Sequence, residues 1–126
     1  MEDPLQSFDY DRLMQANLVR VFSERDAAKR LEAIAELYAE DAVLHEPDAS
    51  FEGHASISQA VTDLLNRFPA DFAFTAIGPA AGHHSIGRLQ WKVGPPNGPV
   101  AATGMDIVHV EGERIHSLHV FIEASS

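Results

Sequence analysis

The sequence predicts an α+β fold, a cone-shaped, curved antiparallel β-sheet with three helices on its concave face. Three observations lead to this prediction. Apolar residues recur with helical spacing up to Pro69. After Pro69 the spacing changes to the two-residue period of a β-strand. Short connections rich in turn-forming residues separate the later strands, and such connections join antiparallel neighbours.

Three stretches have the spacing of an amphipathic helix. The first, at about 9–23, has an apolar face formed by Met14, Leu18, Val21 and Phe22. The second begins near Ser23 or Asp26, either of which can cap it. Its predicted face is formed by Leu31, Ile34, Ala35 and Tyr38. The third follows Gly53 and ends at Pro69, with a stripe formed by Ile57, Val61, Leu64, Leu65 and Phe68.

The strands are expected at 42–46, 72–77, 85–93, 100–110 and 114–123. Residues 47–53 are expected to form a loop, because Pro47 has no N–H to donate to a sheet. Residues 94–99 and 111–113 are expected to form hairpin turns. The order is therefore helix, helix, strand, helix and four strands. Since the helices are not interleaved among the last four strands, they must cover one face of the sheet.

Length and composition narrow the classes of protein. A chain of 126 residues is expected to form one domain, here 9–126, preceded by a flexible arm at 1–8. The absence of cysteine excludes disulfides, thiolate metal sites and a cysteine nucleophile. With 9 basic and 19 acidic residues the net charge is −10, which disfavours nucleic acids and anionic membranes as partners. No apolar run approaches the length of a membrane span and no secretory signal is recognisable, so we expect a cytoplasmic protein.

Seven histidines raise the question of a metal site. His116 and His119 are three residues apart on a predicted strand, so their side chains are expected on opposite faces. His83 and His84 lie in a predicted loop, and no helix carries two histidines four residues apart. No phosphate-binding loop or nucleotide motif is present. We therefore expect neither a metal ion nor another cofactor.

Alternation along the last two strands separates two faces of the sheet. One face is expected to carry Ala102, Gly104, Asp106, Val108, Val110, His116, Leu118, Val120 and Ile122. The other carries the bulky apolar residues Met105, Ile107 and Phe121. Because the helices cover only one face, we expect the convex face to pair two copies of the chain in a homodimer. The alternative is a monomer that exposes these residues.

Asp106 is the strongest candidate for a catalytic residue. A carboxylate in the middle of an apolar strand is costly unless it is paired or protonated, and burial raises its pKa. Such a group suits general acid or base catalysis. The alternative is a structural aspartate that binds backbone amides or a neighbouring Arg or Tyr. Glu46 and His45 are further candidates, and because they are adjacent on a strand only one of them can face a pocket. His116 shares the predicted face of Asp106 and could move a proton near the pocket mouth.

Two stretches of the chain resemble the SnoaL-like branch of the nuclear transport factor 2-like superfamily. Residues 37–61 contain a Tyr-Ala-x-Asp-Ala turn into a strand and a Phe-x-Gly closure before a helix. Residues 103–123 contain a Gly-x-Asp strand and a Gly-x-Arg-Ile hairpin. The resemblance in element order covers about 9–124 and implies an apolar pocket between the concave sheet and the helices. The implied lining is Leu18, Tyr38, Val61, Leu89, Trp91, Asp106, Leu118, Val120 and Ile122, with His116 near the mouth.

The resemblance also implies roles for the candidate residues. In ketosteroid isomerase-like members the general base is a carboxylate just before the proline of this strand, which is Glu46 here. Their second carboxylate falls at Asp106, whereas their tyrosine falls near Asn17 or Leu18, so half of that oxyanion site is missing. In SnoaL-like cyclases the Gly-x-Asp carboxylate is the acid or base, and that role transfers to Asp106.

Three functions are consistent with the sequence. The first is an acid–base isomerase or cyclase acting on an apolar carbonyl compound, with Asp106 assisted by Glu46 or His45. The second is a protein that binds a small apolar ligand without chemistry. The third is a dimeric protein-interaction adaptor, whose acidic surface would suit a basic partner.

Overall fold

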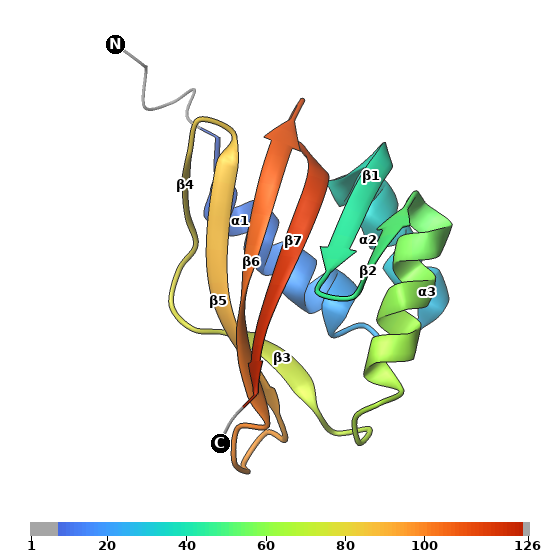
Figure 1. Ribbon diagram of the computed structural model, residues 1–126, viewed down its shortest axis with the longest axis vertical. Coiled ribbons are helices and arrows are strands. Elements are labelled where there is room, and N and C mark those ends of the chain that lie inside the picture. Colours follow the sequence, from blue (N-terminus) through green and yellow to red (C-terminus); the bar gives the residue numbers. More distant parts are fainter. Residues whose placement is uncertain (1–7, 125–126) are drawn as a thin grey trace.

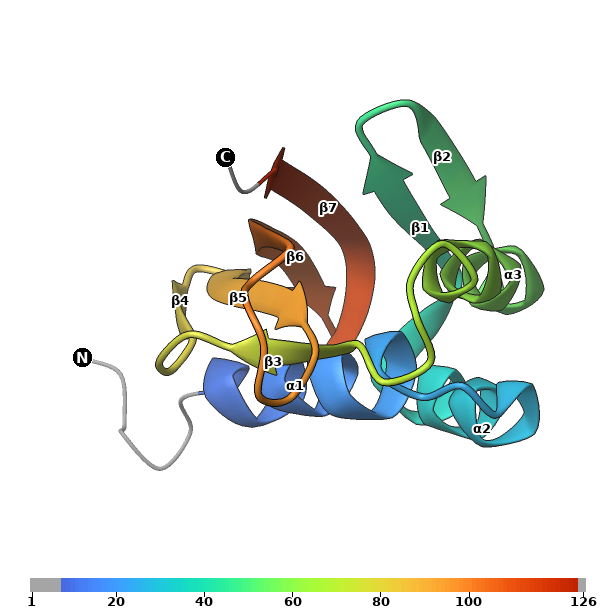
Figure 2. The same ribbon diagram turned by 90° about the horizontal axis from the view of Figure 1, so that it is seen from below.

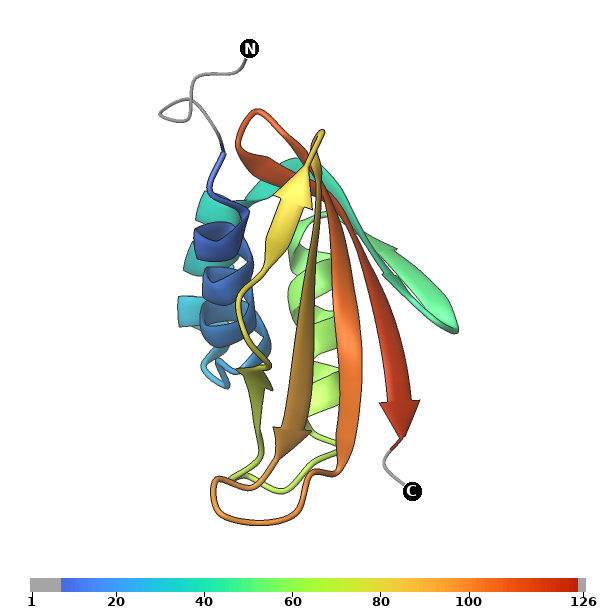
Figure 3. The same ribbon diagram turned by 90° about the vertical axis from the view of Figure 1, so that its left-hand side faces the viewer.

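Seven strands form one curved sheet, and the helices pack against one of its faces (Figures 1 and 3). The computed structural model describes residues 8–124. The helices are α1 (Tyr10–Asn17), the π-helix η2 (Leu18–Phe22), α2 (Ala27–Leu37) and α3 (His54–Leu65). The strands are β1 (Tyr38–Glu46), β2 (Ala49–Glu52), β3 (Ala73–Ala76), β4 (Ala81–His83), β5 (Ile86–Gly94), β6 (Ala102–Glu111) and β7 (Arg114–Ala124). The α+β class is confirmed. The predicted arm at 1–8 lies outside the described residues except for Phe8, which packs edge-to-face on Tyr10.

The strand order is β2-β1-β7-β6-β5-β3, and β4 also pairs with β5. Every pair is antiparallel except β1 with β7, which is parallel. The predicted antiparallel sheet is therefore confirmed, with this one parallel pair as the exception. A parallel pair needs a long crossover connection, and everything between β1 and β7 in the chain supplies it. Figure 2 shows that the β1–β2 hairpin lies at the α3 end of the sheet, away from β4.

Two short strands were missed by the sequence prediction. Residues 47–53 do not form a plain loop, because β2 pairs back on β1 with Glu46 opposite Ala49. Pro47 therefore lies in the turn of this hairpin, where its missing N–H costs nothing. Strand β4 was missed because its turn into β5 lacks the usual glycine signal; instead His84 and Ser85 adopt positive φ angles of 50° and 71°.

The first helix changes from α to π geometry at Leu18. The Ser23 N–H donates to the carbonyl oxygen of Leu18, five residues earlier, at 3.0 Å. The predicted apolar face of this helix is confirmed, because Met14, Leu18, Val21 and Phe22 are all buried. Asp26 caps α2 through the N–H groups of Ala28 and Lys29, at 2.9 and 3.2 Å. Ser23, the other predicted cap, instead bonds to the backbone of Phe74.

The buried stripe of α2 differs from the predicted one. Ile34 is buried as predicted, but Leu31 and Ala35 are exposed, and Arg30 and Ala33 are buried instead. Arg30 lies one helical turn before Ile34, on the same face of the helix. The predicted face contained apolar residues only, so it did not include Arg30. Tyr38, which was assigned to the same helix, is the first residue of β1 and has an extended backbone.

Arg30 is a buried cation that joins α2 to α3. Its guanidinium donates to the Glu24 carbonyl at 2.9 Å, to the Ser58 carbonyl at 2.9 Å and to the Thr62 hydroxyl at 2.6 Å. Burial lowers the pKa of Arg30, although Glu24 and Asp26 partly oppose this effect. Its partners are neutral oxygens, so the charge is stabilised by hydrogen bonds rather than by an ion pair.

Replacing Arg30 with alanine should lower the free energy of unfolding by about 3 kcal/mol, because it leaves buried acceptors unpaired and opens a cavity. Chemical denaturation of the wild type and Arg30→Ala measures this difference. Arg20→Ala is the matched control, since Arg20 pairs with Glu36 at 2.8 Å on the exposed surface. The control should lose less than about 1 kcal/mol. Equal losses in the two variants would contradict a structural role for Arg30.

No helix within residues 8–124 is long and apolar enough to cross a membrane.

Candidate functional site

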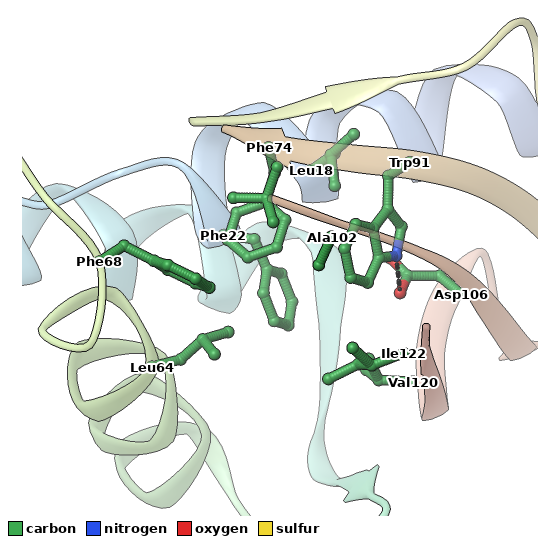
Figure 4. A pocket seen from close by; sticks show the side chains of 11 residues that line it. Leu18, Phe22, Leu64, Phe68, Phe74, Trp91, Ala102, Asp106, Val120 and Ile122 are labelled. Atoms are coloured by element: carbon green, nitrogen blue, oxygen red, sulfur yellow. Dashed lines mark hydrogen bonds between the residues drawn. The ribbon is translucent and has the colours of Figure 1, made fainter. Parts of the chain in front are cut away.

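An apolar cavity lies between the sheet and the helices, with a volume of about 30 Å³ open to the centre of a water molecule. The space not filled by atoms, including the solvent at its open mouth, is about 380 Å³. Ten of its eleven lining residues are apolar, and the exception is Asp106. Figure 4 shows these side chains pointing toward a common space. The lining consists of Leu18, Phe22, Leu64, Phe68, Phe74, Trp91, Val93, Ala102, Asp106, Val120 and Ile122.

The register of β5, β6 and β7 brings the strand residues of the cavity together. Asp106 on β6 lies between Leu89 on β5 and Val120 on β7, whose side chains share its face of the sheet. The helical layer adds Leu18 and Phe22, which both come from the π-helix η2. The cavity is therefore bounded by β5, β6 and β7, by Phe74 of β3, by η2, and by Leu64 of α3 with Phe68 just after it.

Asp106 is buried, with 3 % of its surface exposed. The indole N–H of Trp91 donates to Oδ1 of Asp106 at 2.9 Å, as the dashed line in Figure 4 marks. Burial raises the pKa of Asp106 to about 7, and the hydrogen bond from Trp91 opposes this rise. A carboxyl group with this pKa is present in both its acid and its base form near neutral pH, as proton transfer in both directions requires.

The glycine of the Gly-x-Asp sequence, Gly104, makes room for the side chain of Trp91. Trp91 on β5 faces Gly104 on β6. A Cβ atom at Gly104 would collide with the Trp91 ring and with the carbonyl oxygen of Phe121. The indole therefore lies across the bare backbone of Gly104, and from there it reaches Asp106 two residues farther along β6.

Tyr38 and Asn17 form a second buried polar pair. The Tyr38 hydroxyl donates to Oδ1 of Asn17, and both residues are at most 1 % exposed. Burial raises the pKa of Tyr38 well above its ordinary value, and the charge of Asp106 adds to this effect. Neither residue lines the cavity, so Tyr38 is not the lining residue that was predicted; its hydroxyl instead binds Asn17.

The two candidates on β1 point to opposite sides of the sheet. Leu44 is buried opposite Leu118, and Glu46 shares the side of Leu44. Glu46 is half-buried, and burial raises its pKa while Arg67 opposes the rise. His45 lies on the other side, where its ring stacks on His119 at 4.5 Å and its Nδ1 contacts the Ser50 hydroxyl at 2.8 Å. Of the three predicted catalytic residues, only Asp106 is a lining residue of the cavity.

His116 does not share the face of Asp106, because β7 contains a bulge. Val110 pairs with Ile115 and His109 pairs with Ser117, so His116 is an extra residue between the two registers. Ile115 takes the inward position and is fully buried. Nδ1 of His116 instead lies 3.1 Å from the carboxylate of Glu111.

The other predicted ligand-binding residues divide into two groups. Leu18, Trp91, Val120 and Ile122 line the cavity. Val61, Leu89 and Leu118 are buried core residues that do not reach it. The sequence interpretation did not select Phe22, Leu64, Phe68, Phe74, Val93 and Ala102, which also line it. Phe22, Leu64 and Phe68 belong to the predicted apolar stripes of the helices. Val93 and Ala102 share the strand faces of Trp91 and Asp106. The spacing of these five residues could therefore have identified them.

Across the described part of the chain, no three His, Asp or Glu side chains come together in a way that could hold a metal ion.

Comparison with known proteins identifies the family of this chain. A family model for the SnoaL-like domain matches residues 17–118, which is most of the chain. The chain belongs to the SnoaL-like domain family. No match is found among curated proteins.

Solved structures support the fold of this SnoaL-like protein. A proposed isomerase of the SnoaL-like family from Agrobacterium tumefaciens C58 is 24 % identical, with a TM-score of 0.81 over 90 % of this chain and 96 % of that one. A proposed polyketide cyclase from Sinorhizobium meliloti is 15 % identical, with a TM-score of 0.66 over 86 % and 93 %. A proposed ketosteroid isomerase from Kribbella flavida is 15 % identical, with a TM-score of 0.64 over 94 % and 83 %. At these identities the likeness shows the fold alone.

Proposed function

We propose that this SnoaL-like protein binds a small apolar carbonyl compound in its cavity and catalyses an isomerisation or cyclisation by moving a proton next to the carbonyl. Asp106 is the group that carries the proton. The observation that supports this proposal is a single ionisable residue, with a pKa of about 7, in a lining that is otherwise apolar. The similar structures proposed to be isomerases and a cyclase support the reaction class.

The proposed step uses both forms of the carboxyl group. The ionised Asp106 removes a proton from the carbon beside the carbonyl, and the electron pair of that C–H bond moves into an enolate. In an isomerisation, a C=C bond of the substrate extends the enolate to a dienolate, and the acid form returns the proton to the far carbon of that dienolate. In a cyclisation, the enolate carbon instead attacks a second carbonyl carbon and Asp106 protonates the oxygen formed. In both cases Asp106 ends in its starting state, so no other reactant is needed.

The lining also favours a neutral substrate. No cationic side chain of residues 8–124 lines the cavity, so a carboxylate or phosphate group would be buried without a counter-charge beside Asp106. The net charge of −10 further disfavours the approach of anions. We therefore propose a neutral compound with an apolar body and one polar end directed at Asp106.

The experiment measures hydrogen–deuterium exchange at the carbon beside the carbonyl. A panel of neutral cyclic enones and ketones is incubated in D₂O with the wild type, Asp106→Asn or Glu46→Gln, and exchange is followed by NMR. The proposal expects exchange above the buffer rate with the wild type and Glu46→Gln but not with Asp106→Asn. Equal rates for the wild type and Asp106→Asn across the panel would contradict it.

Non-catalytic binding of an apolar ligand is a second candidate function. It is favoured by the absence of Glu46 and His45 from the cavity lining, because Asp106 is then the one acid or base that residues 8–124 contribute to the lining. The same panel separates the two functions. Saturable quenching of Trp91 fluorescence without any exchange of deuterium would support binding alone.

We further propose that two copies of the chain pair through the convex face of the sheet. Phe121 is 58 % exposed there, and Met105 and Ile107 on the neighbouring strand are only partly covered. Sedimentation velocity should show a dimer for the wild type and a monomer for Phe121→Glu, because a buried carboxylate would oppose pairing. A wild type that stays monomeric at every concentration tested would contradict the pairing.

A further inference from the structure

Trp91 is the tryptophan that gives Asp106 its hydrogen bond, and the chain contains one tryptophan. Both residues are 3 % exposed, so the bond is shielded from water. Among residues 8–124, no other group donates a hydrogen bond to the Asp106 carboxyl. Figure 4 shows the indole nitrogen directed at one carboxyl oxygen while the ring itself forms part of the cavity wall.

The indole is held in this orientation from two sides. On one side the missing side chain of Gly104 leaves the space in which the ring lies, because a Cβ there would collide with it. On the other side the ring of Phe74 packs edge-to-face on Trp91, with centroids 5.1 Å apart at an angle of 76°. The direction of the N–H is therefore set by packing, whether or not Asp106 is ionised.

A free carboxyl group can rotate and exchange its two oxygens, so either of them could meet a substrate. A hydrogen bond to Oδ1 removes this freedom and leaves Oδ2 available to a bound molecule. We propose that Trp91 is a positioning residue, which fixes Oδ1 of Asp106 so that Oδ2 exchanges the proton with the substrate. Gly104 is the residue that makes this arrangement possible. The inference rests on the proposed function of Asp106.

The first test replaces Trp91 with phenylalanine, which keeps an aromatic ring in the wall and removes the N–H. Because this hydrogen bond favours the charged form, its loss should move the titration midpoint of Asp106 upward by about one pH unit. The midpoint is measured from the side-chain carboxyl ¹³C resonance of Asp106, assigned by comparison with Asp106→Asn. The control is Val61→Ala, which removes packing from a buried core residue that does not reach the cavity, and its midpoint should stay at the wild-type value.

The pH dependence of deuterium exchange should move in the same direction in Trp91→Phe. A role in packing alone would lower stability without moving either midpoint. An unchanged midpoint in Trp91→Phe would therefore overturn the inference.

The second test needs no change at Trp91. A protein with one tryptophan gives one indole N–H resonance in a ¹H–¹⁵N spectrum, and this resonance should shift with the midpoint of Asp106. The shift should be absent in Asp106→Asn. An indole resonance in the wild type that does not respond to pH near 7 would overturn the inference. Failure of the proposed function looks different, since the indole resonance would still titrate while no ketone exchanged deuterium at any pH.

Discussion

The variant Asp106→Asn is expected to exchange deuterium into an enolisable ketone about 10²–10⁴-fold more slowly than the wild type, the usual contribution of one general acid or base. Asparagine has nearly the shape of aspartate and can still accept the Trp91 N–H through its amide oxygen. The cavity should therefore keep its form while losing the group that titrates. Initial rates at pH 7 with a saturating ketone measure the difference.

Two controls accompany this rate measurement. Glu46→Gln and His45→Gln remove the other two candidates of the sequence interpretation and should each change the rate less than about 3-fold, because neither residue lines the cavity. A ligand-induced change in Trp91 fluorescence that persists in Asp106→Asn shows that the substrate still enters. A larger loss of rate in either control than in Asp106→Asn would move the reaction away from Asp106.

The same substitution is expected to stabilise the protein at alkaline pH. Asp106 has a folded pKa of about 7 against an ordinary value of 3.8, so between these values the folded state holds a proton that the unfolded state has released. The unfolded state then binds fewer protons, and the free energy of unfolding falls as pH rises through this window. The contribution of Asp106 falls by about 4 kcal/mol across the window and is constant above pH 8.

Asp106→Asn removes this dependence. Urea unfolding of the wild type and the variant at pH 4, 6 and 8 should therefore show a difference in stability that grows in favour of Asn as pH rises. Asn17→Asp, a new carboxyl group beside Tyr38, is a useful comparison because it should show the opposite sign and destabilise the protein most at pH 8. A constant difference between the wild type and Asp106→Asn from pH 4 to 8 would mean that Asp106 is not perturbed by burial.

Much of the fold could be predicted from periodicity, because the three apolar stripes and the alternation after Pro69 are strong local signals. The exceptions have separate causes. The parallel pairing of β1 with β7 joins segments far apart in the sequence, and no local sequence pattern predicts it. Strand β4 is three residues long and ends in a turn without glycine, so neither its length nor its turn gave a signal.

Some residues of the candidate site could be predicted from local alternation, whereas others could not. Alternation placed Asp106 on the inward face, and burial raises its pKa in the expected direction. The same alternation placed His116 on the wrong face, because one bulge residue reverses the parity of a strand. The partnership of Trp91 with Asp106 depends on the register of β5 against β6 and on the missing side chain of Gly104. Both are visible only when the two strands are paired.

The pH dependence of the deuterium-exchange rate, measured with one neutral ketone in the wild type, tests the central claim about Asp106 most directly. The rate of proton removal should rise with pH and level off, with a midpoint near 7 that matches the ¹³C titration of Asp106 in the same sample. A midpoint near 4, or a profile that Asp106→Asn reproduces, would contradict the account.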